Sequence, residues 1–493
     1  MRRGAYHDSV SLMQASHEVQ QVPGVSAALV AMATELNLDL LAGLGFAAPE
    51  GAGPNELFVA VRAEDDAAVE AALAALAGAL TARPAGGLSG FSGFSGLSGD
   101  PLPARTAGAA AARSQATLAL ISVPGRYAFV EAMDALDAGL SVLLFSDGVT
   151  VAEEVRLKDE AAGRDLLLMG PDCGTAIVGG VGLGFANVVR SGPVGIVAAS
   201  GTGAQQLCCL LDAAGVGVSQ VLGVGGRDLS AEVAGRSTLQ ALAALDADPA
   251  TELVVVVSKP PAADVAVGVS EAAAAMSTPV VLGLLGPDRP DLTEVAADVL
   301  SRVGGTVPDW PRWGPPQERR PGSLRGLFCG GTLCDEAMLI ASAALGRIAS
   351  NIPLQADWAL PHDLRDAGHL MIDFGDDALT QGRPHPMIDP SLRTERLLAE
   401  GTDPATAVVL LDVVLGHGAH DDPAADLAPA IATARRTAAD SGRDLAIVVS
   451  LCGTAGDPQG RDSQAEALVA AGASVFASNA IAARHAVALV SGS

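Results

Sequence analysis

The stretch formed by residues 193–215 constrains the fold of this chain more than any other. An apolar run, Val194–Ala199, stops at Ser200-Gly201-Thr202-Gly203, and a helical pattern follows at once. The first backbone N–H groups of a helix have no intrahelical partner, so such a corner between a strand and a helix suits an anion. The same design recurs at residues 326–332 and 448–454. The sequence therefore predicts a protein that directs helix N-termini at a negatively charged group, such as a phosphate.

The rest of the chain alternates strand-like apolar runs with helical patterns, which predicts an α/β fold with parallel sheets covered by helices on both faces. A chain of 493 residues is long enough for roughly three to four domains. We predict a small α/β module, a Gly/Ser-rich linker, three further segments of α/β type and a Pro-rich linker before the last of them. In chain order these segments are residues 1–82, 83–113, 114–191, 192–303, 304–323 and 324–493.

In the first module, strands are expected at Ser9–Gln14, Ala27–Thr34 and Glu56–Arg62, followed by a helix at Asp65–Leu80. Strands of the later segments are expected at positions that include Leu118–Val123, Leu253–Ser258, Leu324–Phe328, Leu370–Phe374, Ala407–Leu411 and Leu445–Leu451.

The net charge of the chain limits the kinds of partner that it can bind. A net charge of −26 argues against nucleic acid and anionic membrane surfaces. The apolar runs are far shorter than a membrane span, and the N-terminal segment lacks the apolar core of a signal peptide, so we expect a cytoplasmic protein. The six cysteines show no C-x-x-C spacing, which predicts buried thiols and neither a zinc site nor disulfides.

Lysine is almost absent, and the two that remain are Lys158 and Lys259. Lys259 directly follows an apolar strand, where a compact cation suits a phosphate or carboxylate; the alternative is a solvent-facing loop lysine.

Ligands of open parallel sheets bind beyond the carboxyl ends of the strands. Residues at these ends include Gly225-Gly226 and Gly330-Gly331-Thr332. Any one of them is explained equally well by a short turn, but Gly-Thr corners that recur before helices favour a binding site.

Histidine is missing between His17 and His362. Arg383 and His385 lie in a long polar loop, and we take both as candidate catalytic residues, although local hydrogen bonds and prolines explain the loop equally well. His417 and His420 lack a third ligand at a fixed spacing, so no metal site is predicted.

Several motifs together resemble the succinyl-CoA synthetase superfamily, and more closely its FdrA-type branch. Residues 122–124, 137–139, 146–149 and 170–173 resemble the CoA-binding domain of the synthetase α-subunit, and residues 193–211 resemble its phosphate-facing helix start. Residues 327–335 resemble the equivalent helix start of the β-subunit, and residues 382–389 fit the FdrA branch. The match covers about residues 115–493. It implies a CoA-binding-like Rossmann domain at 114–191 and ligase-type, flavodoxin-like domains at 192–303 and 324–493.

The chain also departs from the synthetases. It has Leu284-Leu285-Gly286-Pro287-Asp288 where they carry a phosphoryl-shuttling histidine, Lys259 where they carry a carboxylate, and no N-terminal glycine loop for CoA. The FdrA family is associated with anaerobic allantoin breakdown, and the resemblance implies a subunit of an oxamate carbamoyltransferase. Such an enzyme converts oxalurate and phosphate to oxamate and carbamoyl phosphate, which requires donors for phosphate and for a developing oxyanion.

The expected site follows from this reaction. The residues expected to bind phosphate are Ser200, Gly201, Thr202, Gly225, Gly226, Gly330, Gly331 and Thr332. Lys259 is expected to neutralise the phosphate, and Arg383 to hold the substrate carboxylate, with His385 as a further catalytic candidate. If CoA binds, the resemblance assigns it to Pro124, Asp147, Asp172 and Cys173.

Two other functions stay open. One is an acyl-CoA ligase whose nucleotide is supplied by a partner subunit, and the other is a non-catalytic scaffold or regulatory subunit. In each case we expect an oligomer, and for the transferase other carbamoyltransferase subunits as partners.

Overall fold

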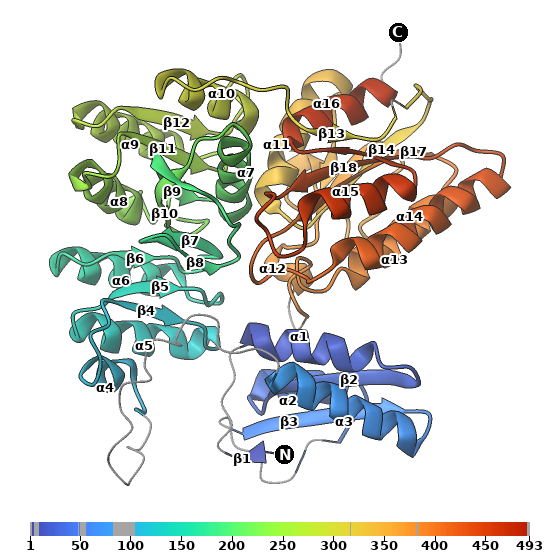
Figure 1. The fold of residues 1–493 in the computed structure, drawn as a ribbon, viewed down its shortest axis with the longest axis horizontal. Coiled ribbons are helices and arrows are strands. Elements are labelled where there is room, and N and C mark those ends of the chain that lie inside the picture. The colour runs from blue at the N-terminus through green and yellow to red at the C-terminus, as the bar shows by residue number, and fades with distance from the viewer. Residues whose placement is uncertain are drawn as a thin grey trace. The chain divides into compact units, whose positions relative to one another are not determined.

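The computed structural model describes residues 2–3, 9–47, 49, 56–81, 104–315, 317–380 and 383–490 (Figure 1). The predicted Gly/Ser-rich linker falls largely outside these residues. The chain divides into two compact units: residues 1–114 with 381–384, and residues 115–380 with 385–493.

The N-terminal unit is a small antiparallel sheet covered by helices. The strand order is β1-β3-β2, and a cluster of apolar side chains from α1, β2, β3 and α3 forms its core. Its elements are β1 (Arg2–Arg3), α1 (Ser9–Gln20), β2 (Val25–Met32), α2 (Glu35–Gly43), β3 (Glu56–Ala63), α3 (Asp66–Thr81) and α4 (Ala107–Ala111).

The strand predicted at Ser9–Gln14 is wrong, because these residues begin helix α1. Leu12, Ala15 and Val19 are buried at helical spacing, and the hydroxyl of Ser16 donates to the backbone oxygens of Leu12 and Val30. Six residues were too short a window to separate a period of two from one of 3.6.

The larger unit begins with a parallel three-stranded sheet of the Rossmann type, in the order β4-β5-β6. Helices α5 and α6 connect the strands. The elements are β4 (Leu118–Ile121), α5 (Gly125–Asp137), β5 (Ser141–Leu144), α6 (Val151–Gly163) and β6 (Leu168–Met169).

A six-stranded sheet follows, in the order β12-β11-β9-β10-β7-β8. Strands β9 to β12 are parallel, whereas β7 and β8 pair antiparallel and lie before residue 192, where the second α/β segment was predicted to start. The strands are β7 (Thr175–Val178), β8 (Val181–Gly184), β9 (Ser191–Ala199), β10 (Val218–Gly223), β11 (Leu253–Ser258) and β12 (Val280–Leu284). The helices are α7 (Gly201–Ala213), α8 (Arg236–Ala247), α9 (Ala263–Ala275) and α10 (Leu292–Arg302).

The C-terminal part holds a seven-stranded sheet in the order β13-β19-β18-β17-β14-β16-β15, parallel except for β13. The strands are β13 (Arg312–Trp313), β14 (Ser323–Phe328), β15 (Ala349–Ser350), β16 (Leu370–Asp373), β17 (Thr406–Val414), β18 (Ala446–Cys452) and β19 (Ala473–Phe476). The helices are α11 (Gly331–Leu345), the 3₁₀ turn η1 (Ala356–Trp358), α12 (Asp377–Thr380), α13 (Ser391–Thr402), α14 (Pro423–Asp440), α15 (Arg461–Ala470) and α16 (Asn479–Val490).

The central strands of both larger sheets are buried along their whole length, as β11 and β17 show. Parallel strands covered by helices on both faces read as continuous apolar runs, which is why the sequence located them. The α/β class with parallel sheets is therefore confirmed.

The two larger sheets are joined through helices α7 and α11, which pack against each other (Figure 1). Buried amides strengthen this joint. The Gln206 side chain donates to the backbone oxygen of Ala477 and accepts from the backbone N–H of Asn479. Both strand-to-helix corners therefore lie in one packed body.

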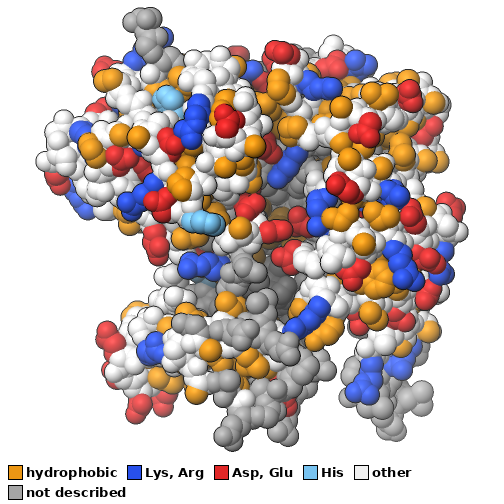
Figure 2. Space-filling view, turned by 180° about the vertical axis from the view of Figure 1, so that it is seen from behind, with side chains coloured by type: hydrophobic (Ala, Val, Ile, Leu, Met, Phe, Trp, Pro, Cys, Tyr) orange, Lys and Arg blue, Asp and Glu red, His pale blue; other side chains and the backbone are white. Residues whose placement is uncertain are grey.

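On the face drawn in Figure 2, acidic and basic side chains are interspersed. This is the mixed arrangement of an ordinary solvated surface. None of the helices in the described ranges is both long and apolar enough to cross a membrane.

Candidate functional site

The two glycine-threonine corners are in direct contact. Ser200 caps helix α7, since its hydroxyl oxygen accepts from the backbone N–H of Gly203 at 2.9 Å, and it donates to the hydroxyl of Thr332 at 2.7 Å. A Cβ placed on Gly330 would lie 2.9 Å from the hydroxyl oxygen of Thr202. The absence of a side chain at Gly330 thus lets the start of α11 approach the start of α7.

Part of the predicted donor set is already used within the protein. The carboxylate of Asp412 accepts from the backbone N–H groups of Cys329 and Gly330, at 2.7 and 2.8 Å, and is paired with Arg393 at 2.7 Å. Asp412 therefore holds the two residues that follow β14 in position through their backbone N–H groups. The phosphate-binding roles of Ser200, Gly330 and Thr332 remain predictions, and any anion here relies on the later N–H groups of α11.

The third corner differs from the first two. After β18 the segment 453–460 is a loop, and α15 starts only at Arg461. The hydroxyl of Thr454 donates to the backbone oxygen of Val188, while Asp457 accepts from Asn187 and from the backbone of Val188. This corner therefore joins segments of the protein and does not expose a helix N-terminus.

Lys259 lies at the joined corners, immediately after β11. A Cβ on Gly331 would be 2.8 Å from the Lys259 ammonium and 2.6 Å from a carboxylate oxygen of Asp373. Burial by itself would lower the pKa of Lys259, but the carboxylates of Asp335, Asp373 and Asp172 outweigh it and hold this pKa above its usual value. The lysine is therefore charged at neutral pH.

Two aspartates beside Lys259 are buried. Burial raises the pKa of Asp335 to about 6 and that of Asp373 to about 7, although Lys259 lowers both. One oxygen of Asp373 accepts from the backbone N–H of Gly375 at 2.9 Å. The pair can therefore hold protons near neutral pH, as an acid–base site requires.

His385 is brought to the same place. A Cβ on Gly375 would lie 2.9 Å from its Nε2 and 3.1 Å from Asp373 Oδ1. Burial, with the nearby Arg393, lowers the pKa of His385 to about 4, so the ring is neutral at pH 7. Nδ1 accepts from the backbone N–H of Met387 at 3.2 Å, which assigns the ring proton to Nε2. The Nε2–H of His385 therefore lies near Gly375 and Asp373, where it can donate to a ligand.

Gly225 and Gly226 lie beside Asp172. A Cβ on Gly225 would be 2.5 Å from the backbone oxygen of Pro171, and one on Gly226 would be 4.0 Å from Asp172 Oδ2. Burial of the carboxyl group, then Asp377 and Asp147, raises the pKa of Asp172 to about 7, although part of the side chain stays open to solvent. Asp172 therefore extends the acidic lining.

The candidate CoA residues divide into two kinds. Cys173 is buried, which raises its pKa to about 12 and makes its thiol unreactive. Pro124 precedes α5, and a Cβ on the following Gly125 would be 2.3 Å from the backbone oxygen of Asp147. The loops after β4 and β5 therefore touch, as the resemblance implies, while CoA binding stays a prediction.

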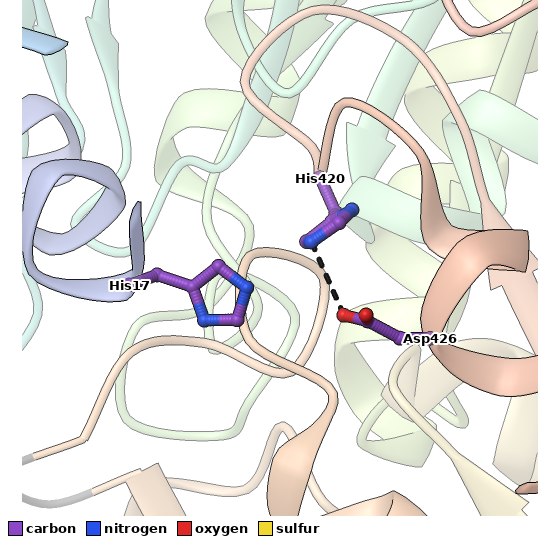
Figure 3. A group of neighbouring side chains, drawn as sticks. All are labelled: His17, His420 and Asp426. Atoms are coloured by element: carbon purple, nitrogen blue, oxygen red, sulfur yellow. Dashed lines mark ion pairs between the residues drawn. The ribbon is translucent and has the colours of Figure 1, made fainter. Parts of the chain in front are cut away.

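The remaining candidates fall outside this cluster. Arg383 is exposed and belongs with the N-terminal unit, so its role with a carboxylate stays a prediction. His420 Nε2 lies 3.3 Å from an oxygen of Asp426, and its Nδ1 accepts from the backbone N–H of Asp422 (Figure 3). His17, also drawn in Figure 3, lies on α1 of the N-terminal unit. The exposed His417 contacts Ala186 through its backbone.

Lys158, the other lysine, is structural. It is completely buried and donates at 2.7 Å to both Glu154 and Asp228, and at 3.0 Å to the backbone oxygen of Val224. Asp228 also accepts from the start of α8, through Thr238. This ion-pair group attaches α6 to α8.

Sequence reasoning missed three aspartates, Asp335, Asp373 and Asp412. Asp373 ends β16, and Asp412 lies within β17 just past the strand end that was predicted. Both aspartates stand at or near the carboxyl end of a strand, the position at which Asp147 and Asp172 were predicted, so the same sequence signal indicates them. Asp335 lies in α11, and only the fold places it beside Lys259.

The arrangement combines one charged ammonium, two carboxyl groups that titrate near neutral pH and a neutral imidazole that donates. It is suited to bind an oxyanion, to transfer a proton and to stabilise negative charge on an oxygen.

Comparisons with known proteins support a family. A family model described as CoA-ligase matches residues 327–489, and one described as AllF, heavy metal-associated domain, matches residues 1–91. YahF of Escherichia coli, described as uncharacterized, is 38% identical over 96% of this chain and 94% of its own length. The succinate–CoA ligase [ADP-forming] subunit alpha 2 of Archaeoglobus fulgidus is 30% identical over 39% of this chain and 67% of its own.

Similarity to solved structures is more distant. The dinucleotide-forming acetyl-coenzyme A synthetase 1 of Ca. Korarchaeum cryptofilum, in complex with phosphate and ADP, is 15% identical, with a TM-score of 0.28 over 76% of this chain and 85% of that one. The near full-length match to YahF and the CoA-ligase match together identify the family of this chain. The chain belongs to the FdrA-type family of the succinyl-CoA synthetase superfamily.

Proposed function

We propose that this protein is a phosphate-dependent carbamoyltransferase subunit that acts on oxalurate and phosphate, or on oxamate and carbamoyl phosphate in reverse. The observation that carries the proposal is the contact between the two corners, with Lys259 beside the start of α11. Family membership supports an acyl-CoA synthetase-like enzyme, and the carbamoyl chemistry is the finer step that we add.

In this reaction a phosphate oxygen attacks the carbamoyl carbon of oxalurate. The bond from that carbon to the bridging nitrogen breaks, and the nitrogen takes a proton to become the amide of oxamate. Lys259 neutralises the phosphate, and the N–H groups at the start of α11 orient it.

Asp373 and His385 carry out the two remaining tasks, which are proton transfer and stabilisation of the oxyanion. Asp373 takes the hydrogen of the attacking hydrogen phosphate and passes it to the leaving nitrogen, since its pKa, raised to about 7, lets the carboxyl group exchange a proton near neutral pH. The Nε2–H of His385 stabilises the oxyanion that develops on the carbonyl.

The test is an assay for carbamoyl phosphate formed from oxalurate and phosphate, with the full chain co-purified with proteins encoded beside it. We expect Lys259→Ala to lower the rate by about a hundredfold or more, or about 2.7 kcal/mol, because an uncompensated anion is left in a buried site. Arg302→Ala serves as the control, since it removes a positive charge from an exposed ion pair on α10. A rate that survives Lys259→Ala identifies the chain as a scaffold.

A CoA ligase is the second candidate, favoured by the succinate–CoA ligase names of several relatives. A ligase would form acyl-CoA from a carboxylic acid, CoA and ATP. Neither a carbamoyltransferase nor a scaffold would form this product.

A further inference from the structure

Asp335 is the most unusual group at the joined corners. Its side chain is only 7% exposed, and among the described residues it has neither a hydrogen-bond nor an ion-pair partner. Lys259 is its main electrostatic neighbour. Neither oxygen of Asp335 is among the described side-chain atoms that are both fully buried and unpartnered, so a water molecule or a ligand can reach this carboxyl group.

Asp373 adds a second acceptor to the same lining. One of its oxygens is held by the backbone N–H of Gly375, and the other faces the position of Gly331 and Lys259. An ionised carboxylate only accepts hydrogen bonds. The site therefore offers donors from Lys259 and helix α11, and acceptors from the two aspartates.

Oxyanions differ in whether they carry a hydrogen. Inorganic phosphate keeps at least one hydrogen across neutral pH, so it can donate to a carboxylate. Sulfate carries none and meets an ionised carboxylate as one like charge meets another. A site with both donors and acceptors therefore discriminates between two anions of similar size and shape, because one of them leaves acceptors unpaired.

We infer that Asp335 and Asp373 make this site selective for oxyanions that carry a hydrogen, so that it binds hydrogen phosphate and rejects sulfate. The inference rests on the proposed function, whose substrate it deepens. It also explains why carboxylates line an anion site: they supply specificity and reduce affinity for competing dianions.

The experiment is calorimetric titration of the full chain with inorganic phosphate and, separately, with sulfate. Titrations are made at about pH 8, where Asp335 and Asp373, whose pKa values are raised to about 6 and 7, are ionised. We expect phosphate to bind at least about tenfold more tightly than sulfate, a difference of about 1.4 kcal/mol.

Two variants assign the selectivity. Asp335→Asn and Asp373→Asn keep the size of the side chain, remove its charge and add a donor, so each is expected to gain sulfate affinity about tenfold. Asp298→Asn, on the exposed surface of α10, is the matched control and leaves the preference unchanged. If one variant is poorly folded, the phosphate preference of the wild type and the sulfate affinity of the other variant still test the inference.

The outcomes separate this inference from the proposed function. Equal binding of phosphate and sulfate by the wild type, or a preference unchanged in both variants, overturns the selectivity while phosphate binding stands. Binding of neither anion, with the partner proteins present, overturns the proposed phosphate site and the inference with it.

Discussion

At the scale of single residues, Asp373 connects the parts of the site. Its two oxygens face different neighbours, with Gly375 and His385 on one side and Gly331 and Lys259 on the other. It is only 4% exposed, and burial raises its pKa to about 7. Its protonation state therefore affects both stability and chemistry.

The stability of the protein should depend on pH through this residue. An aspartate in an unfolded chain titrates near about 4, so folded Asp373 holds its proton more tightly, and its contribution to the free energy of unfolding falls as pH rises from about 4 to 7. Asp373→Asn removes that loss. Relative to the wild type, the variant should be more stable at about pH 8 than at about pH 5, by on the order of 1–3 kcal/mol.

Thermal unfolding midpoints at the two pH values measure this difference, and Asp298→Asn on the exposed surface of α10 provides the reference. A difference between variant and wild type that is the same at both pH values contradicts the raised pKa.

Lys158 makes a contrasting prediction, because it is buried for stability. Lys158→Met keeps the volume but leaves the buried Asp228 without its cation and Glu154 with Arg227 alone. We expect the free energy of unfolding to fall by about 3–5 kcal/mol. Removal of the exposed Arg302 by Arg302→Met should change it by no more than about 0.5 kcal/mol. Urea unfolding of both variants tests this, and equal small losses would show that the buried ion pairs contribute nothing.

At the scale of elements, the close approach of α7 and α11 depends on one missing side chain. Gly330→Ala introduces a Cβ within 3.0 Å of three atoms of Thr202, so we expect a loss of about 1–3 kcal/mol from overpacking. Thr202→Ala removes two of those atoms. The double variant should therefore lose less than the sum of the single variants, by about 1 kcal/mol.

A double-mutant cycle from unfolding curves measures this coupling. Gly163→Ala is the control, because a Cβ there meets no atom within 4 Å. Strict additivity of Gly330→Ala and Thr202→Ala would mean that the two corners do not touch.

How far the sequence predicted these elements depends on what each pattern encodes. Buried parallel strands such as β11 and β17 are continuous apolar runs, and Gly-Thr corners mark where helices α7 and α11 start, so both were found. Helix α1 was missed because a short alternating run fits either period. The cluster of Asp335, Asp373 and Lys259 comes from different segments, and only the packing of the sheets brings them together.

At the scale of the whole molecule, the chain belongs to a superfamily of acyl-CoA synthetase-like proteins, and a buried imidazole lies among the acidic groups at the joined corners. Members of the superfamily that use a phosphohistidine need a free ring nitrogen as nucleophile. In His385, Nδ1 accepts from Met387 and Nε2 carries the proton, so neither nitrogen has an available lone pair.

The whole protein should therefore not become phosphorylated. After incubation of the full chain with ATP labelled at the γ-phosphate, we expect no label on the protein, whereas a succinyl-CoA synthetase assayed in parallel is labelled. Label on His385, found by peptide mapping and lost in His385→Asn, would favour the ligase.

The central claim is that the joined corners hold phosphate beside Lys259. A crystal structure of the full chain grown with inorganic phosphate tests it most directly. The account predicts an anion that accepts from the Lys259 ammonium and from backbone N–H groups in the first turn of α11, with Asp335 or Asp373 accepting a hydrogen bond from it. A Lys259 ammonium paired directly with these carboxylates, with no phosphate at the corner, would contradict the account.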